Sequence, residues 1–333
     1  MEKIKENMYA PVLIPTLCRY EHFVKLIDSL QKCKFADKTE IVIGLDYPAK
    51  KEHIEGYERI NSYIDNGING FRKVTVIKHK KNVGETKNIS LMMNYIEEKY
   101  DKFILTEDDN IFANSFLSYI NTMLEYYKES DKVKIICGFS YPVKWSDVQH
   151  QEIIEEQSFF SAWGYAMYIK TDKELDDYFN KKQYVDQFIH GHLAEKLYKK
   201  SKKNFCYFIN SLWNDNLTKT DIGISIYQIA CDKYCVMPSM SLVRNEGWDG
   251  TGVNCNNDLT LSAIFSNQLI NEEIIDWSMK INGKQIIYDP ENEKIINKFF
   301  PPSVKMFIIA IVRYMFLLAK NHFALCNNKK NIK

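Results

Sequence analysis

The first half of the chain alternates short apolar runs with longer stretches in which apolar residues recur every three or four positions. The short runs have the length of buried strands, and the longer stretches have the period of amphipathic helices. Strands that alternate with helices in this way favour an α/β fold, a Rossmann-like and mostly parallel sheet with helices on both faces. The strands are predicted at 11–16, 40–46, 73–78, 103–105 and 132–138, and the helices at 21–33, 51–65, 85–98 and from 114 onward.

The second half of the chain is less regular. An aromatic-rich stretch at 158–169 ends like a strand, and a glycine-rich loop at 247–252 follows a short apolar piece. The composition changes between 290 and 302, and there is no internal repeat or low-complexity linker. The expected organisation is therefore one domain at 8–260, an extension at 261–302 and a last helix at 303–326. Further helices are predicted at 172–179, 184–200 and 210–232.

The last helix combines a broad apolar surface with a basic stripe. At 100° per residue, Lys305, Arg313 and Lys320 fall within a sector of about 80°. Such an amphipathic helix suits the interface of an anionic membrane, and we expect the protein on the inner face of the cell membrane. A spanning helix is less favoured because Arg313 would lie near the bilayer centre. Docking on the core or on another subunit is the alternative.

Composition narrows the classes of partner. The chain has 333 residues, of which 45% are hydrophobic, enough for a large packed core. With 44 basic and 43 acidic residues there is no basic excess, so nucleic acid is not an expected partner. None of the eight cysteines forms a CxxC pair, which favours buried thiols in a reducing compartment. The first residues lack the apolar stretch of a secretory signal, and a cytoplasmic location is expected.

Three adjacent carboxylates, Glu107, Asp108 and Asp109, directly follow the predicted strand at 103–105. Such a cluster repels itself and is costly beside a sheet unless a cation binds it. Mn²⁺ and Mg²⁺ prefer carboxylate oxygens, and the carboxyl end of a strand is where open α/β sheets bind ligands. We therefore predict a divalent metal at Asp109, with Asp108 and Glu107 nearby. A solvated acidic loop with a helix-capping aspartate is the alternative.

The order of several motifs resembles glycosyltransferases of the GT-A fold, above all bacterial family 2 enzymes and the family 13 N-acetylglucosaminyltransferases. The resemblance covers residues 10–255, and its strongest part is the acidic cluster, which is similar to the Glu-Asp-Asp form of the DxD signature. The other similar segments are 11–19 (first strand and nucleotide loop), 82–88 (the Asn-x-Gly stretch of family 2), 213–215 (the Trp-Asp-Asp segment) and 240–247 (the piece before a closing loop).

The resemblance implies roles for single residues. Arg19 is expected to contact the nucleotide and Asp46 to recognise the uracil or ribose, while Lys87 could assist at the diphosphate. Asp215 is the candidate general base, because Asn214 stands where family 13 has an acid. The alternatives for the base are Asp249, Asp221 and Glu246, and the aromatic residues proposed to stack on sugars are Trp163, Tyr165 and Trp213.

The resemblance thus implies an inverting, metal-dependent hexosyl- or N-acetylhexosaminyltransferase that uses a UDP-sugar. The expected acceptor is a hydroxyl of a glycan or lipid-linked glycan in surface polysaccharide synthesis, and the sequence leaves the sugar, linkage and oligomeric state open. A nucleotidyltransferase is the enzyme alternative, but it would carry a glycine-rich phosphate loop near the first strand, and 15–19 contains no glycine. A nucleotide-sugar or glycan-binding protein without turnover is the other alternative.

Overall fold

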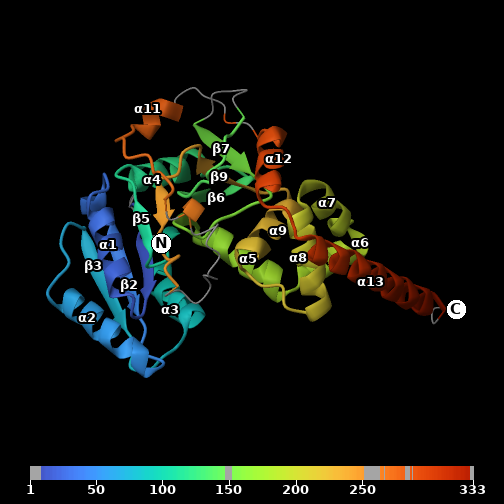
Figure 1. Ribbon diagram of the computed structural model, residues 1–333, viewed down its shortest axis with the longest axis horizontal. Helices are drawn as coiled ribbons and strands as arrows, with labels where there is room; N and C mark the ends of the chain where they lie inside the picture. Colours follow the sequence, from blue (N-terminus) through green and yellow to red (C-terminus); the bar gives the residue numbers. More distant parts are fainter. Residues whose placement is uncertain are drawn as a thin grey trace, which may run out of the picture.

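The computed structural model describes residues 9–146, 152–250, 263–265, 267–281, 286 and 288–330, with side chains as far as residue 320. Within this part of the chain an eight-stranded sheet forms the centre, in the order β3-β2-β1-β4-β8-β6-β9-β7 (Figure 1). Its strands are β1 (Val12–Thr16), β2 (Glu40–Leu45), β3 (Lys73–Lys78), β4 (Lys102–Leu105), β6 (Val133–Cys137), β7 (Ile153–Glu156), β8 (Tyr165–Tyr168) and β9 (Tyr234–Pro238).

The first four strands of the sheet are parallel and alternate with helices, as predicted. Val12 and Ile14 of β1 pack in the same core cluster as α1 and α4, whereas Leu13 packs with α3 on the opposite face. Because β1 is covered on both faces, it reads as a continuous apolar run. The helices of this half are α1 (Tyr20–Gln31), α2 (Ile54–Asp65), α3 (Glu85–Glu97) and α4 (Phe116–Tyr126), with short 3₁₀ turns η1 (Ala36–Lys38) and η2 (Lys51–His53).

Beyond β4 the sheet becomes mixed. Strand β8 is antiparallel to both β4 and β6, and β7 is antiparallel to β9, whereas β6 and β9 are parallel. Parallel pairings still outnumber antiparallel ones, so the predicted α/β class with a mostly parallel sheet and flanking helices is confirmed. The carboxyl ends of β1, β2 and β4 lie at one edge of the parallel half, which is where the candidate residues are found.

A second, two-stranded sheet was not predicted and is important for the site. Strands β5 (Asn110–Phe112) and β10 (Val243–Asn245) pair antiparallel, with Asn110 opposite Asn245. Each strand has only three residues, too few for a recognisable alternation of apolar and polar positions. The pairing brings residues 245–247 to the acidic cluster from the other half of the chain.

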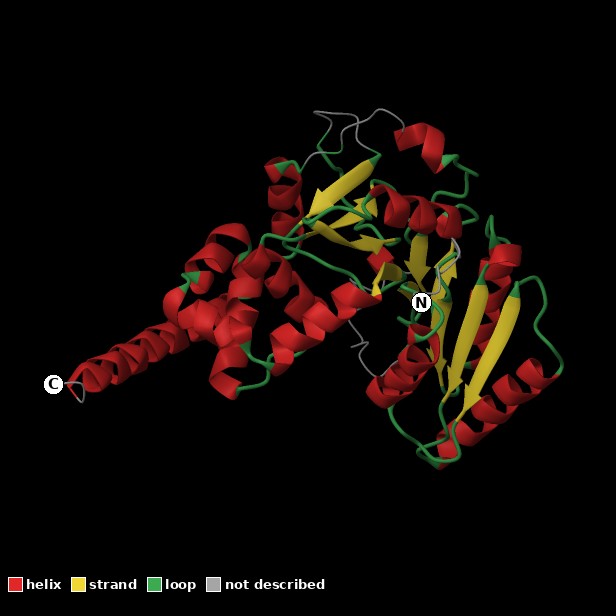
Figure 2. Ribbon diagram, turned by 180° about the vertical axis from the view of Figure 1, so that it is seen from behind, coloured by secondary structure: helices red, strands yellow, loops and turns green. Residues whose placement is uncertain are grey.

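The second half adds a group of helices beside the sheet (Figure 2). The helix predicted at 184–200 is broken at His192, and the helix predicted at 210–232 is broken at Asp215. Both residues have left-handed backbones, with φ of 55° and 51°, which end a helix. This group consists of α5 (Ile169–Asn180), α6 (Gln183–His190), α7 (Leu193–Lys200), α8 (Lys202–Asn214) and α9 (Asp221–Cys231). Helix α11 (Trp277–Ile281) lies instead against α4, and α12 (Pro290–Phe299) lies against β7.

The predicted C-terminal helix is present as α13 (Val304–Lys330). Its first half packs on α8, and the rest extends away from the body of the protein (Figure 1). Among the described residues, no helix by itself has the length and apolarity needed to cross a membrane. The segments 290–299 and 304–320 meet that test only when taken together, and the chain bends by 112° between them.

Candidate active site

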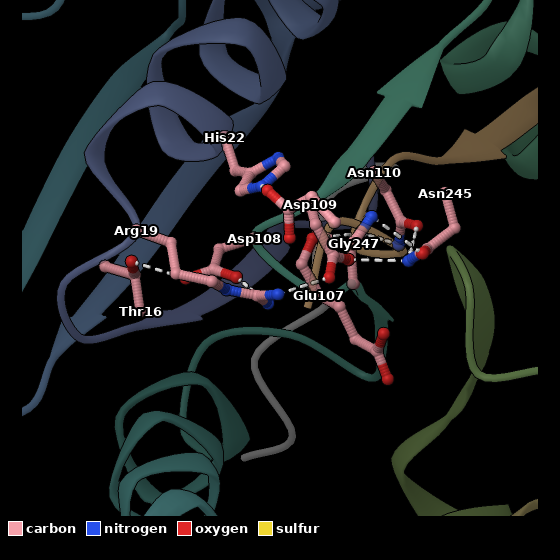
Figure 3. A network of polar contacts seen from close by, with 11 residues as sticks. Thr16, Arg19, His22, Glu107, Asp108, Asp109, Asn110, Asn245 and Gly247 are labelled. Atoms are coloured by element: carbon pink, nitrogen blue, oxygen red, sulfur yellow. Dashed lines mark hydrogen bonds and ion pairs between the residues drawn. The ribbon is translucent and has the colours of Figure 1, made fainter. Parts of the chain in front are cut away.

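The acidic cluster lies at the carboxyl end of β4, next to the carboxyl end of β1. Because the two strands are parallel neighbours, Thr16 and Arg19 reach the carboxylates that follow β4 (Figure 3). Thr16 Oγ1 donates to Asp108 Oδ2 at 2.8 Å, and Arg19 Nη1 donates to Asp109 Oδ2 at 2.6 Å. The second guanidinium nitrogen of Arg19 pairs with Asp108. Arg19 therefore bridges both aspartates, and its predicted contact with the nucleotide stays a prediction.

The two aspartates are buried, at 6% exposed for Asp108 and 3% for Asp109. Burial raises the pKa of Asp108, while the charge of Arg19 and the hydroxyl of Thr16 oppose that rise. The neighbouring acids in turn hold the pKa of Arg19 above its ordinary value despite its burial, so Arg19 stays charged. One guanidinium thus compensates part of the charge of two buried carboxylates.

A loop from the second half of the chain covers Asp109. Asn245 Nδ2 donates to Asp109 Oδ1 at 2.6 Å, and the backbone N–H of Glu246 donates to the Asp109 carbonyl at 2.9 Å. A Cβ on Gly247 would lie 2.0 Å from Asp109 Oδ2, so the loop can take this position only with glycine there. Glu246 is ion-paired with Lys25 and Arg244, each at 2.8 Å.

Substitution of Gly247 tests this contact. We expect Gly247→Ala to push the loop off Asp109 and to lower thermal stability by about 1–3 kcal/mol, the usual range for an overpacked buried position. Met240→Ala, at an exposed position shortly before the loop, is the control and should change stability little. Thermal unfolding of both variants measures the difference. An unchanged midpoint for Gly247→Ala would mean that the loop is not held against the cluster.

Glu107 differs from the two aspartates. Its carboxylate points away from the Arg19 guanidinium (Figure 3). Burial raises the pKa of Glu107 to about 8, with further contributions from the charges of Asp109, Asp221 and Glu85. At neutral pH this carboxyl is therefore mostly protonated and can donate a hydrogen bond. The same interactions place Glu107 within electrostatic range of Asp221 and of the first turn of α3.

Asp221, an alternative rather than the leading candidate from sequence, lies at the start of α9. Thr220 caps that helix by accepting from the Gly223 N–H at 3.3 Å. Asp221 Oδ2 accepts from the backbone N–H of Ala162 at 3.2 Å, which fixes the carboxylate beside the segment after β7. Burial raises the pKa of Asp221 to about 6, although part of the residue stays exposed. A partly accessible carboxylate with a raised pKa is well suited to accept a proton.

The structure places Asp215, the predicted base, on the protein surface. Its side chain is 71% exposed and accepts from Lys182 Nζ at 2.6 and 2.7 Å. It ends α8 with a left-handed backbone instead of opening a helix, and no interaction connects it to the described carboxylates of the cluster. An exposed carboxylate that is ion-paired away from the cluster does not have the position that a base requires. We therefore transfer the proposed role to Asp221.

Asp46 is buried at the end of β2, but its four acceptor positions are already used. It accepts from the backbone N–H groups of Tyr47, Val83 and Gly84 at 2.8–2.9 Å and from Asn82 Nδ2 at 3.1 Å. An ionised carboxylate offers about four lone-pair sites, so none remains for a nucleoside. In this arrangement Asp46 holds the loop before α3, and the predicted contact with the uracil or ribose would require this loop to open.

The remaining predicted contacts are spread over the molecule. Lys87 is exposed in the first turn of α3, near the acidic cluster because neighbouring Glu85 acts on Glu107. Trp163 contacts Trp248 of the covering loop, with ring centroids 6.2 Å apart. Tyr165 is a core residue, and Trp213 packs on α13 with its ring 6.3 Å from Phe316. Of the three aromatic residues, Trp163 alone is placed to line the site. Thr16 and Asn245 were missed, although each stands in or beside a segment singled out from sequence.

A divalent cation suits the chemistry of this cluster, but the protein supplies few ligands. The carboxylates of Asp108 and Asp109 are the hard donors that Mg²⁺ and Mn²⁺ prefer. Within the described residues, no three acidic, histidine or cysteine side chains converge as a metal site. Mg²⁺ often takes one or two carboxylates and completes its shell with substrate phosphates and water. A cation at Asp109 would therefore depend on a phosphorylated ligand and would compete with Arg19.

Comparisons with known proteins add little to this geometry. No protein-family model and no curated protein matches the chain. Two similar solved structures are S. aureus TarS (TM-score 0.31, 14% identity, 44% of this chain and 24% of that one) and the Pyrobaculum calidifontis mannosyltransferase PcManGT in complex with GDP-Man and Mn²⁺ (TM-score 0.36, 13% identity, 52% of this chain and 49% of that one). The chain thus spans at most half the length of either protein. At these scores the similarity decides nothing about activity, and function is argued from the site.

Proposed function

We propose that this protein is a glycosyltransferase that transfers a sugar from a nucleotide-sugar to a hydroxyl group. The observation that carries the proposal is that one edge of the sheet holds two kinds of acidic residue, one paired with a cation and the other with a raised pKa. On one side, Asp108 and Asp109 are both ion-paired with one cation, Arg19. On the other, Asp221 has a pKa raised to about 6, and its charge contributes to the raised pKa of Glu107. Such an arrangement suits a reaction in which one group leaves as an anion and another loses a proton.

The leaving group in this proposal is a nucleoside diphosphate. Arg19 is a partly buried cation beside the two aspartates, and Lys87 is exposed at the neighbouring helix start, so both suit charge-assisted hydrogen bonds to phosphate. When bound at Asp109, Mn²⁺ or Mg²⁺ would neutralise charge developing on the diphosphate. The loop at 245–247, fastened by Asn245, would cover the donor and exclude water from it.

The proton acceptor in this proposal is Asp221. A sugar or other hydroxyl is a poor nucleophile at neutral pH and needs a base within hydrogen-bond reach. Ala162 N–H donates to Oδ2 of the Asp221 carboxylate and so fixes its position. A single carboxylate base on the acceptor side suits direct displacement, and we propose inversion at the sugar carbon. We further propose a UDP-sugar as donor and a glycan or lipid-linked glycan as acceptor, on the motif resemblance alone.

A thermal-shift screen of nucleotide-sugars with and without Mn²⁺ tests the proposal. A ligand that binds only the folded state raises the unfolding midpoint by mass action. We expect one nucleotide-sugar to raise the midpoint more than its free sugar does, with the larger shift in Mn²⁺. The screen should include UDP-, GDP- and CMP-linked sugars, with EDTA as the metal-free control. If no nucleotide-sugar shifts the midpoint at millimolar concentration, this site does not bind such a donor.

A further inference from the structure

Helix α13 carries two apolar faces rather than one. The inward face packs on the core formed with α8, whereas seven large apolar side chains on the outward face are between 36% and 77% exposed. A surface helix of a soluble protein normally places charged and polar residues there. The outward face consists of Val304, Ile308, Ile309, Val312, Met315, Phe316 and Leu318.

One of the three basic residues that the helical projection places in one sector contacts the body of the protein. Arg313 turns inward, where Nη1 donates to Asn210 Oδ1 at 2.9 Å and the guanidinium lies 5.5 Å from the Trp213 ring. Lys305 and Lys320 remain exposed, one in the first turn and one near the end of the described side chains. The outward face is therefore a continuous apolar strip with a lysine toward each end.

Trp213 extends this surface beyond the helix. It is 47% exposed and contacts Phe316 at the side of the strip. Tryptophan has an apolar body and a polar N–H, and it is enriched where protein meets the headgroup region of membranes. Figures 1 and 2 both show α13 extending from the body, so other elements do not shield the far part of the helix.

The charge of the C-terminal segment indicates which kind of partner binds the outward face of α13. Residues 294–333 contain eight basic residues and no aspartate or glutamate. A second copy of the same segment packed on the outward face would bring like charges together, which is unfavourable. An anionic surface, in contrast, is complementary to such a segment. The basic residues are Lys294, Lys298, Lys305, Arg313, Lys320, Lys329, Lys330 and Lys333.

We propose that the outward face of α13 binds the surface of an anionic lipid bilayer. The helix lies in the plane of the membrane, with its apolar strip in the upper acyl region and Lys305 and Lys320 extended to the lipid phosphates. Trp213 sits at the headgroup level beside Phe316. The inward face keeps its packing on α8, so the protein binds without unfolding. This interaction is independent of the proposed sugar transfer.

Co-sedimentation of the full chain with vesicles tests the proposal. We expect binding to vesicles of phosphatidylcholine and phosphatidylglycerol in equal parts and much weaker binding to phosphatidylcholine alone. The triple variant Ile308→Asn, Val312→Asn, Met315→Asn should lower the partition coefficient at least about tenfold. Lys305→Glu with Lys320→Glu should also lower it at least about tenfold, with a weaker salt dependence than the wild type. The control triple Leu269→Asn, Ile274→Asn, Met279→Asn changes exposed apolar residues elsewhere and should bind as wild type does.

Two results would overturn the proposal. One is a co-sedimentation result in which the wild-type protein does not bind anionic vesicles at low salt, or in which the α13 triple variant binds them as strongly as the wild type does. The other is a wild-type dimer in multi-angle light scattering that becomes monomeric in the α13 triple variant, which would assign the outward face to a second copy. The unfolding midpoint of each variant is measured alongside. If the asparagine triple does not fold, the variant of the two exposed lysines, Lys305 and Lys320, tests the proposal in its place, and unchanged binding by it would overturn the proposal.

Discussion

Asp221→Asn is expected to lower the turnover of a donor and acceptor pair at least about a hundredfold while donor affinity stays within about twofold. The variant keeps an oxygen that can accept from Ala162 N–H, so the local geometry should survive, but it cannot accept a proton. Wild-type kcat/KM should rise with pH through about 6, where Asp221 ionises, and then level off. Steady-state rates and donor calorimetry on both proteins measure the two effects.

The same substitution should stabilise the fold at neutral pH. The pKa of Asp221 is higher in the folded protein than its ordinary value of 3.8, so the folded state binds the proton more tightly than the unfolded chain does. Stability therefore falls as pH rises from about 4 to about 6, and the penalty is complete above that range. Asp221→Asn removes this cost of ionising the carboxyl in the folded protein. We expect the free energy of unfolding to rise by about 1–3 kcal/mol at pH 7 and to change little at pH 4.

Asp215→Asn is the matched control, since it makes the same chemical change at an exposed carboxylate paired with Lys182. It should leave turnover and donor affinity unchanged. If Asp215→Asn instead loses turnover and Asp221→Asn does not, the base is the one predicted from sequence, and the surface position of Asp215 must change on binding. An equal loss of donor affinity and turnover in Asp221→Asn would make Asp221 a structural or donor-binding residue.

Asp109→Asn is expected to weaken donor binding in Mn²⁺ at least about tenfold and to remove most of the difference between Mn²⁺ and EDTA. Asp109 contacts Arg19 and Asn245. A neutral amide at this position would have no negative charge to attract either the metal cation or Arg19. Donor calorimetry with Mn²⁺ and with EDTA measures the effect. Asp177→Asn, an exposed aspartate paired with Lys181 on α5, is the control for loss of one negative charge.

The competition between Arg19 and a cation provides a check on this prediction. Because Arg19 pairs with both aspartates, Arg19→Ala should raise the affinity for Mn²⁺ in the absence of donor. It should also destabilise the fold by about 3 kcal/mol, since it leaves buried carboxylates without their partner. Full activity of the wild type in EDTA, together with unchanged donor affinity in Asp109→Asn, would show that the cluster is structural.

The parallel half of the sheet could be predicted because its signals are local. Strand β2 lies within one residue of its predicted end, and the acidic cluster was found because three adjacent carboxylates after a buried strand are unusual. The pairing of β5 with β10 could not be predicted in this way. It joins three-residue segments more than 130 positions apart, and only the packed fold brings them together.

The base could be predicted only as one of several acids. Asp215 and Asp221 are six residues apart, and both lie within the helix predicted at 210–232. What separates them is the left-handed backbone at Asp215, which ends α8 and turns its side chain outward, whereas Asp221 opens α9 beside Ala162. Asp46 shows a similar limit, because its position at a strand end is visible in the sequence but its four hydrogen bonds are not.

The most direct test of sugar transfer is the identity of the nucleotide that wild-type protein releases from the donor found in the thermal-shift screen. Chromatography of the reaction, with acceptor glycan and Mn²⁺ present, should show nucleoside diphosphate in equal amount to sugar-extended acceptor, with at least about a hundredfold less of both for Asp221→Asn. From a diphosphate-linked donor, nucleoside monophosphate as the released product would indicate transfer of a phosphosugar, and from a CMP-linked donor it would contradict the proposed diphosphate leaving group. Release of pyrophosphate, or of no nucleotide from a bound donor, would likewise contradict glycosyl transfer at this site.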